Sequence, residues 1–422
     1  MKKFGQRILA FGLAGIMALG VAGCGQNNNN TASATTEEIT SAEVSSEENE
    51  VQENTLHKIA VIVYNTDDDE VRMFRSYYED YLENTFDVDF VYSDSISDIN
   101  QEKEFIDNAK AEGCEGVISF VSYNLPEIVD YCEDLYYVAG STSYSDDIFE
   151  QVKGKENFLG TMSPTSEDEI QAGASMIEAL GAENGSSKNW VVCSGGSPLG
   201  NFAHKQRLIG MLDTLENKLG FTLTAKPEEI AAAKESMVIA ENPAGGKVTL
   251  APGYFSREAF HDSVVATIDD NTDIVASVCN IHPILTNIEE TETSANKNIK
   301  IGAVDCFSDQ NADAINNPDA SGNPQIDYIV GKCQAMGAPA FIALYNAITG
   351  HADLVRNNNE AFRLYQGFWT ASNPDEYNEL KVKADNIYTN VYGSKDMMDV
   401  MAIYNPAATF ADFENFVNKI NE

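Results

Sequence analysis

Polar and aromatic side chains stand directly after several apolar runs of strand length, and their types suit reversible binding of a polar small molecule. Hydroxyl, amide and carboxylate groups exchange hydrogen bonds with a ligand, while an arginine offers a fixed fork of donors. In open parallel sheets, ligands bind outside the carboxyl ends of the strands. The residues that these rules nominate are Tyr64, Asn65, Thr66, Ser122, Asn124, Ser141, Thr142, Asn201, Phe202, Arg207, Asn280 and Asp305.

The same chain shows no motif for catalysis. It has no GxSxG, no GxxxxGK[ST] and no GxGxxG after a strand, and the glycine-rich stretch Ser194 to Ser197 is predicted to be a ligand-facing turn. Its 5 histidines show no HxxxH or HxH spacing, which argues against a metal site. Nothing singles out a pair of carboxylates for glycoside hydrolysis. We therefore expect no enzyme, no cofactor and no metal.

An acidic run, Asp67-Asp68-Asp69-Glu70, follows the first apolar strand. Acidic side chains at the start of a helix are favoured by the positive end of the helix dipole. We expect these four residues to open a helix, and a cation-binding role is the alternative.

Composition and charge limit the class of protein. The chain has 422 residues, of which 43% are hydrophobic and 22% charged, so it should fold as two globular lobes. With 27 basic against 66 acidic residues, its formal net charge is −39. Such a surface repels phosphate backbones, and this excludes nucleic acid as a partner. It suits the solubility of an extracellular protein.

The amino terminus predicts export and anchoring. Lys2, Lys3 and Arg7 precede an apolar run over 8–22 that is too short for a membrane span but typical of a secretory leader, residues 1–23. The run ends in Val21-Ala22-Gly23-Cys24, which resembles a bacterial lipobox and implies a lipidated Cys24 as the mature first residue. Residues 24–56 form a polar tether with almost no large apolar side chain. The expected location is extracytoplasmic, at the cell membrane.

Six further cysteines follow Cys24 without any CxxC pair. Several end or follow apolar runs, where a thiol behaves as a small buried hydrophobe. Export permits disulfides, but the spacing assigns no pairing.

Strands and helices alternate along the body of the chain. Apolar runs at 59–64, 88–91, 116–120, 136–139 and 158–162 are separated by helical patterns, and a second series follows with runs at 190–193, 247–250, 274–278 and 299–304. Runs that are apolar on both faces and alternate with amphipathic helices indicate parallel sheets covered on both sides. The predicted fold is α/β, with two Rossmann-like lobes and a ligand cleft between them.

The lobes are expected to share the chain discontinuously. Residues 57–163 plus 325–364 make the N-terminal lobe, and residues 164–324 plus 365–422 make the C-terminal lobe. Three hinge crossings are predicted, near Ser163, at 308–324 and at 350–364.

Four segments, taken in order, resemble the type I periplasmic-binding-protein superfamily, particularly its sugar-binding members, which serve as lipoproteins for ABC importers. In the run 202–211, Arg207 stands three residues before Gly210; the run 256–280 ends in Asn280; and the strand 299–305 ends in Asp305. The segment 336–350 is similar to the family's next helix and its glycine stop. The resemblance covers roughly 58–350.

The resemblance implies roles for matching residues. Arg207 resembles the arginine that binds ligand hydroxyls or a carboxylate, and Asn280 and Asp305 resemble the polar pair beside the hinge. Phe74 stands near the family's aromatic that stacks on a sugar, and Phe202 or Trp369 would supply the opposite wall. An ABC permease is the implied partner, and the protein is expected to act as a monomer.

Two departures from the family bear on the ligand. The loop after the first strand is acidic instead of Asn-Pro-aromatic, and a glutamine of the family is replaced by Gly331 with Lys332 beside it. These changes leave room for an amino sugar, a nucleoside or another charged molecule in place of a neutral hexose. The alternatives are therefore a nucleoside-binding lipoprotein, a sensory module for a membrane receptor and, as a third class, a surface hydrolase.

Overall fold

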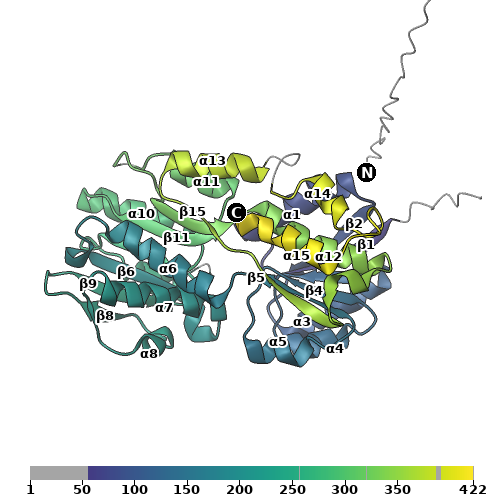
Figure 1. Ribbon diagram of the computed structural model, residues 1–422. Coiled ribbons are helices and arrows are strands. Elements are labelled where there is room, and N and C mark those ends of the chain that lie inside the picture. The colour runs from purple at the N-terminus through teal and green to yellow at the C-terminus, as the bar shows by residue number, and fades with distance from the viewer. Residues whose placement is uncertain (1–55, 256, 320, 386–390, 422) are drawn as a thin grey trace, which may run out of the picture. The chain divides into compact units, whose positions relative to one another are not determined.

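The computed structural model describes residues 56–255, 257–319, 321–385 and 391–421, and the predicted leader, Cys24 and residues 25–55 of the tether lie outside them. The described residues form two sheets of mostly parallel strands, each with helices on its faces (Figure 1). The predicted α/β fold with two parallel sheets is confirmed. We call each sheet with its helices a lobe.

The first sheet has the strand order β13-β14-β5-β4-β3-β1-β2, in which all pairs are parallel except β13 with β14. Its central strands are buried on both faces, because alternate side chains of β1 enter different apolar clusters: Ile59 and Val61 enter one, and Ala60 and Ile62 enter the other. The strands are β1 (His57–Val63), β2 (Val88–Ser95), β3 (Gly116–Ser119), β4 (Tyr136–Gly140), β5 (Phe158–Ser163), β13 (Arg356–Asn357) and β14 (Glu360–Tyr365).

Two groups of helices supply these clusters. One face packs on α3 (Ile99–Ala111), α4 (Leu125–Tyr131) and α5 (Asp146–Val152). The other packs on α1 (Asp69–Ser76), α12 (Ala338–Ile348), α14 (Ser394–Asp399) and α15 (Phe410–Asn418). A π-helical turn at Tyr77–Leu82 and the short α2 (Glu83–Thr85) complete the segment after α1.

The second sheet has the order β15-β12-β11-β10-β6-β9-β8-β7, and its five central strands, from β12 to β9, are parallel. On each side of these five strands the next strand is antiparallel: β15 pairs with β12, and β8 pairs with β9. The strands are β6 (Asn189–Gly195), β7 (Thr222–Leu223), β8 (Met237–Glu241), β9 (Lys247–Pro252), β10 (Ile274–Ser277), β11 (Lys300–Cys306), β12 (Tyr328–Lys332) and β15 (Trp369–Ala371).

Helices cover both faces of the second sheet as well. One face packs on α6 (Ser166–Gly181), α7 (Phe202–Asn217) and α8 (Pro227–Ala231). The other packs on α9 (Glu258–Val265), α10 (His282–Ala295), α11 (Asp309–Asn316) and α13 (Pro374–Asp385). The apolar cluster on this second face continues into the first lobe, so the two lobes share one core region.

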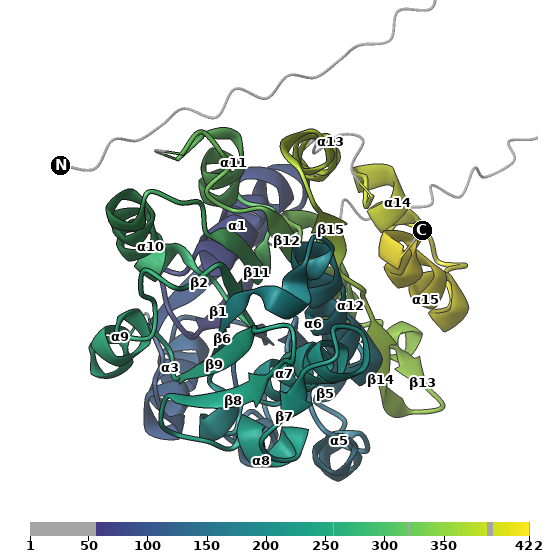
Figure 2. The same cartoon turned by 90° about the vertical axis from the view of Figure 1, so that its left-hand side faces the viewer.

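The predicted lobe boundaries differ from the observed sheets in two places. Residues 325–364 were assigned to the first lobe, yet β12 pairs with β11 in the second sheet. The C-terminal residues were assigned to the second lobe, yet α15 packs on β14 (Figure 2) and Asn346 of α12 bonds to Val400 O and Ala402 N. An apolar run shows that a strand forms, whereas only long-range pairing decides which sheet it joins.

The observed crossings of the chain between the two lobes differ from the predicted ones in the same way. The first lies between β5 and α6, as predicted near Ser163. The second follows β12, after the predicted 308–324, and the third lies between β14 and β15, just after the predicted 350–364. The chain returns once more to the first lobe between α13 and α14.

Candidate functional site

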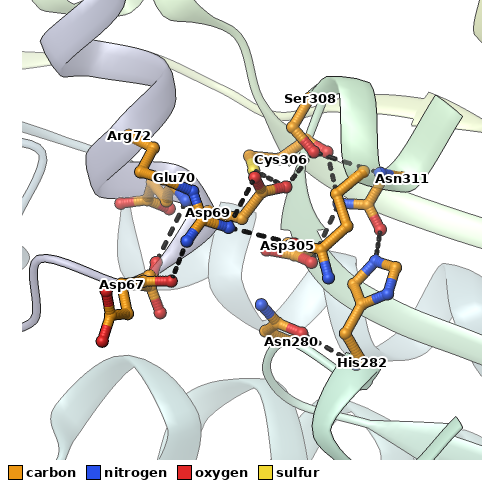
Figure 3. A network of polar contacts seen from close by, with 12 residues as sticks. Asp67, Asp69, Glu70, Arg72, Asn280, His282, Asp305, Cys306, Ser308 and Asn311 are labelled. Atoms are coloured by element: carbon orange, nitrogen blue, oxygen red, sulfur yellow. Dashed lines mark hydrogen bonds and ion pairs between the residues drawn. The ribbon is translucent and has the colours of Figure 1, made fainter. Parts of the chain in front are cut away.

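Most of the polar residues predicted from the sequence lie where strands of the two sheets end, and several of them meet between the lobes. We call Asp68, Asp69, Glu70, Ser141, Arg207, Asp305 and Lys332 the inter-lobe site. Figure 3 shows the part of it in which the first turn of α1 points toward the end of β11. All seven belong to the segments that follow β1 and β4, to α7, or to the ends of β11 and β12.

Arg207 is buried, with 7% of its surface exposed, and its donors are directed at fixed partners. Nε donates to Glu169 Oε2 at 2.5 Å, and Nη1 donates to the carbonyl oxygen of Val278 at 2.8 Å. The ring of Phe368 lies 5.4 Å from the guanidinium carbon. Arg207 is therefore a buried arginine in a salt bridge, which is a sufficient structural reason for its burial. Its position at the inter-lobe site fits the predicted ligand role, which stays a prediction.

Close contact between α6 and α7 makes the Arg207–Glu169 pair possible. A Cβ atom at Gly210 would lie 1.9 Å from the backbone oxygen of Ile170, and one at Gly173 would lie 1.9 Å from the backbone oxygen of Arg207. The close packing of α6 on α7 therefore explains why glycine stands at position 210, three residues after Arg207. Without side chains at these two positions, the helices approach near enough for a buried ion pair.

The acidic run after β1 starts a helix, as predicted. Asp68 is the N-cap of α1 and accepts the N–H of Glu70, while Asp69 and Glu70 occupy its first turn. Tyr64 donates its hydroxyl to Asp68 Oδ1 at 2.9 Å, and Asn65 Oδ1 accepts the backbone N–H of Asp67. Burial, and then the charge of Glu70, raise the pKa of Asp68 to about 6.

The first turn of α1 also links the two lobes. Asp69 accepts a hydrogen bond from the hydroxyl of Ser308, which follows β11. Glu70 pairs with Lys332 at 3.1 Å, and Lys332 also donates to the backbone oxygen of Ser141 at 3.2 Å. Ser141 has a left-handed backbone with φ of 63°. Lys332, named in the sequence only for its place in the family pattern, thus joins the ends of β12 and β4.

Asp305 is the second buried carboxylate at the centre of the site. It is 7% exposed, and its Oδ2 accepts a hydrogen bond from Asn311 Nδ2 at 2.9 Å (Figure 3). Burial raises the pKa of Asp305 well above its usual value, and the charges of Asp68, Asp69 and Glu70 raise it further. Because these charges belong to the first lobe, Asp305 faces them. Neither Asp68 nor Asp305 has an ion-pair partner among the described residues.

Asn280 and Asn201 both serve local turns. Asn280 Oδ1 accepts the backbone N–H of His282 at 2.8 Å, and His282 Nε2 lies 2.9 Å from Asn311 Oδ1. Asn201 caps α7 by accepting the N–H of His204, and its Nδ2 donates to the hydroxyl of Tyr254 at 3.0 Å. His282 on α10 and Asn311 on α11 therefore hold the hydrogen-bond network around Asp305.

The aromatic residues are placed differently from expectation. Phe74 is 1% exposed and stacks on Phe120 with 5.0 Å between the ring centroids, so it belongs to the core. Trp369, 9% exposed, packs edge-on against Phe307 and pairs in the sheet with Gly331, the neighbour of Lys332. Phe202 lines a small pocket of about 80 Å³ beside the first crossing. Phe368, beside Arg207, is the aromatic that the sequence did not single out.

Ser122 lies beside the buried Glu102 of α3, whose pKa its hydroxyl lowers. Other residues that sequence reasoning missed are Glu169, Asn311 and Tyr254. The acidic residue on α6 could be recognised only once its partner on α7 was known, because 38 residues separate Glu169 from Arg207.

Three further findings concern the described residues alone. No group of three or more His, Cys, Asp or Glu side chains there could hold a metal ion. The cysteines Cys114, Cys132, Cys193, Cys279, Cys306 and Cys333 are free thiols, and all but Cys279 are buried. No helix in this part of the chain combines the length and apolar character that a membrane crossing needs.

A second, larger pocket of about 210 Å³ lies by the starting ends of β11 and β12, where Lys300 and Tyr328 line it. It is at the opposite end of these strands from Asp305 and Lys332. We therefore assign it no part in the site.

No protein-family model and no curated protein matches this sequence. Solved structures do match in fold. An ABC transporter solute-binding protein from Bacillus halodurans with bound myo-inositol is 14% identical, covers 78% of this chain and 99% of its own, and has a TM-score of 0.55. The periplasmic binding protein of the arabinose ABC transporter from Shewanella sp. ANA-3 is 14% identical, with coverage of 78% and 95% and a TM-score of 0.53.

A carbohydrate transporter protein from Acidothermus cellulolyticus in complex with myo-inositol is 17% identical, covers 78% of this chain and 99% of its own, and has a TM-score of 0.51. At these identities the likeness concerns the fold. The order of strands in both sheets, the crossings between lobes and these matches together identify the chain as having the two-lobe fold of the type I periplasmic binding proteins.

Proposed function

We propose that this protein is a membrane-anchored extracytoplasmic solute-binding protein that captures a small polar ligand, with a sugar as the expected class, for an ABC importer. The observation that carries the proposal is the inter-lobe site, where polar groups from both lobes converge at the strand ends of a binding-protein fold. Anchoring rests on the lipobox-like Val21 to Cys24. The permease partner rests on the likeness in fold to solute-binding proteins of such importers.

Binding in this proposal is coupled to lobe closure. A ligand that contacts Arg207 and Asp305 on the second lobe and Asp68 on the first has more partners in the closed form than in the open form. Such differential affinity shifts the population toward closure. The contacts of Asp69 and Glu70 with Ser308 and Lys332 support this, because they show that the lobes can be held together at this edge.

The charges at the site favour ligands rich in hydrogen-bond donors. Its cations are already engaged, Arg207 with Glu169 and Lys332 with Glu70. Asp68 and Asp305 remain as acceptors from opposite lobes, and each lies near the charge of the other. Hydroxyls of a sugar or the ammonium group of an amino sugar would satisfy both carboxylates.

The test is a thermal-shift screen of the full chain against neutral sugars, amino sugars, nucleosides and amino acids. A ligand at one hundred times its Kd stabilises the folded state by about 2.7 kcal/mol, which is readily measured. A shift with one sugar class, without any change in that sugar, supports the proposal. Hydrolysis of a candidate sugar would favour a hydrolase, and no shift across the whole panel would contradict sugar capture.

A further inference from the structure

Glu102 of α3 connects the interior of the first lobe with the loop that follows β3. It is fully buried, and its Oε2 accepts the backbone N–H of Tyr123 at 3.1 Å. Tyr123 lies in the β3–α4 loop, residues 120–124, which ends in the first turn of α4. A buried carboxylate that accepts a backbone N–H restricts the conformation of the loop to which that N–H belongs.

Tyr123 is partly exposed and bonded within the first lobe. Its side chain is 43% exposed, and its hydroxyl donates to the backbone oxygen of Ile96 at 2.9 Å. Burial raises the pKa of Tyr123, while the positive charge of Arg257 lowers it, so Arg257 lies close by. Arg257 in turn lies over the ring of Tyr254 at 4.8 Å, and Tyr254 bonds to Asn201. Tyr123 is thus a partly exposed residue of the loop that Glu102 holds.

Few groups around Glu102 stabilise the negative charge of its carboxylate. Its Oε1 and the hydroxyls of Ser122, Tyr137 and Tyr144 have no well-directed hydrogen bond among the described residues. No cation of that part of the chain forms an ion pair with it. Burial raises the pKa of Glu102 to about 7, although the N–H of Tyr123 and the hydroxyl of Ser122 lower it.

The titratable groups near Glu102 come from every element packed around it. They are Tyr123 on the β3–α4 loop, Cys132 after α4, Tyr137 on β4 and Tyr144 between β4 and α5, and the charge of Glu102 raises the pKa of each. All four are neutral around pH 7, since their pKa values are raised from ordinary values that already lie above neutrality. Glu102 is thus the group of this cluster that changes charge near neutrality.

We propose that Glu102 is a positioning residue whose ionised carboxylate holds the β3–α4 loop, and with it Tyr123, in place. An ionised carboxylate accepts a stronger hydrogen bond than a carboxylic acid does. The loop is therefore held firmly above pH 7 and more loosely below it. The relevance of this loop to ligand capture rests on the proposed function, but the positioning itself does not.

The direct test is hydrogen exchange at the Tyr123 amide of the full chain, corrected for the intrinsic pH dependence of exchange. We expect protection in the wild-type protein to rise about tenfold between pH 5.5 and 8.5, because a charge-assisted bond replaces a neutral one. Glu102→Gln keeps an acceptor without a charge, so its protection should not follow pH. Glu102→Ala removes the acceptor and should exchange fast at both pH values. The Phe86 amide, bonded to Leu82 O and outside this loop, is the internal control.

Each result of the exchange experiment either supports or overturns the proposal. Wild-type-like pH dependence in Glu102→Gln, or unchanged protection in Glu102→Ala, overturns the proposal. If Glu102→Ala fails to fold, the comparison of Glu102→Gln with the wild type still decides. Once a sugar is identified, the pH dependence of its Kd should be weaker in Glu102→Gln than in the wild type, because only the titration of Asp68 and Asp305 remains. A failed ligand screen contradicts the proposed function while leaving the exchange result valid.

Discussion

The two lobes bring polar groups to the inter-lobe site in different ways. The second lobe supplies buried charges held by other side chains: Arg207 is fixed by Glu169 of α6, and Asp305 by Asn311 of α11. The first lobe supplies groups held mainly by their own segment, as Tyr64 bonds to Asp68 and Asp68 caps α1. The difference indicates a preformed second-lobe surface and a first-lobe surface that is easier to rearrange.

The largest effect should come from Arg207→Ala. It leaves the buried carboxylate of Glu169 without its partner, and breaking such a pair from one side costs about 3–5 kcal/mol of the free energy of unfolding. The double variant Arg207→Met with Glu169→Gln removes both charges and should recover most of that loss. Denaturant unfolding measures both.

Ligand affinity then tests the site itself. The double variant should fold but lose the ligand found in the thermal-shift screen, since its fork of donors is gone. Unchanged affinity in this stable variant would remove Arg207 from the site.

A smaller effect is expected from Gly210→Ala, which tests how the second lobe positions its arginine. The added Cβ would meet the backbone oxygen of Ile170 at 1.9 Å, so α6 and α7 must separate. Overpacking of this kind costs about 1–3 kcal/mol of the free energy of unfolding and should also weaken ligand binding. Gly154→Ala is the matched control, because a Cβ there has no neighbour within 4 Å. Equal stability of the two variants would argue against the close helix contact.

The last effect, at Asp68, concerns the first lobe. Its pKa is raised from 3.8 to about 6, so the folded state favours the protonated form and loses this part of its stability as pH rises from 4 to 6. Asp68→Asn keeps the cap and the bond from Tyr64 but cannot titrate. We expect the variant to gain stability relative to the wild type over that pH range in thermal unfolding.

Asp67→Asn, at an exposed neighbouring position, should keep the wild-type pH profile and change stability by less than about 0.5 kcal/mol. If Asp68→Asn shows the same pH dependence of stability as Asp67→Asn, the acidic residues after β1 are solvated like ordinary surface residues. The contrast drawn between the two lobes would then fail for the first lobe.

Sequence reasoning located the strand ends better than the side chains that meet there. Asp305 and Arg207 were predicted from their positions after apolar runs, and the structure buries both at the inter-lobe site. Phe74 and Trp369 were carried over from a family pattern, but both pack in the core. Aromatic residues serve cores and ligand walls equally well, so residue type alone does not separate the two roles.

Hydrophobic period and helix capping are local properties, so the amino-acid pattern alone predicts the alternation of strands and helices, the parallel character of the sheets and the acidic start of α1. Long-range contacts in the folded chain place β12 in the second sheet, pair Glu169 with Arg207 and bring Glu70 to Lys332. The two ion pairs join residues 38 and 262 positions apart. Their energies come from burial and charge in the folded chain, which no local pattern records.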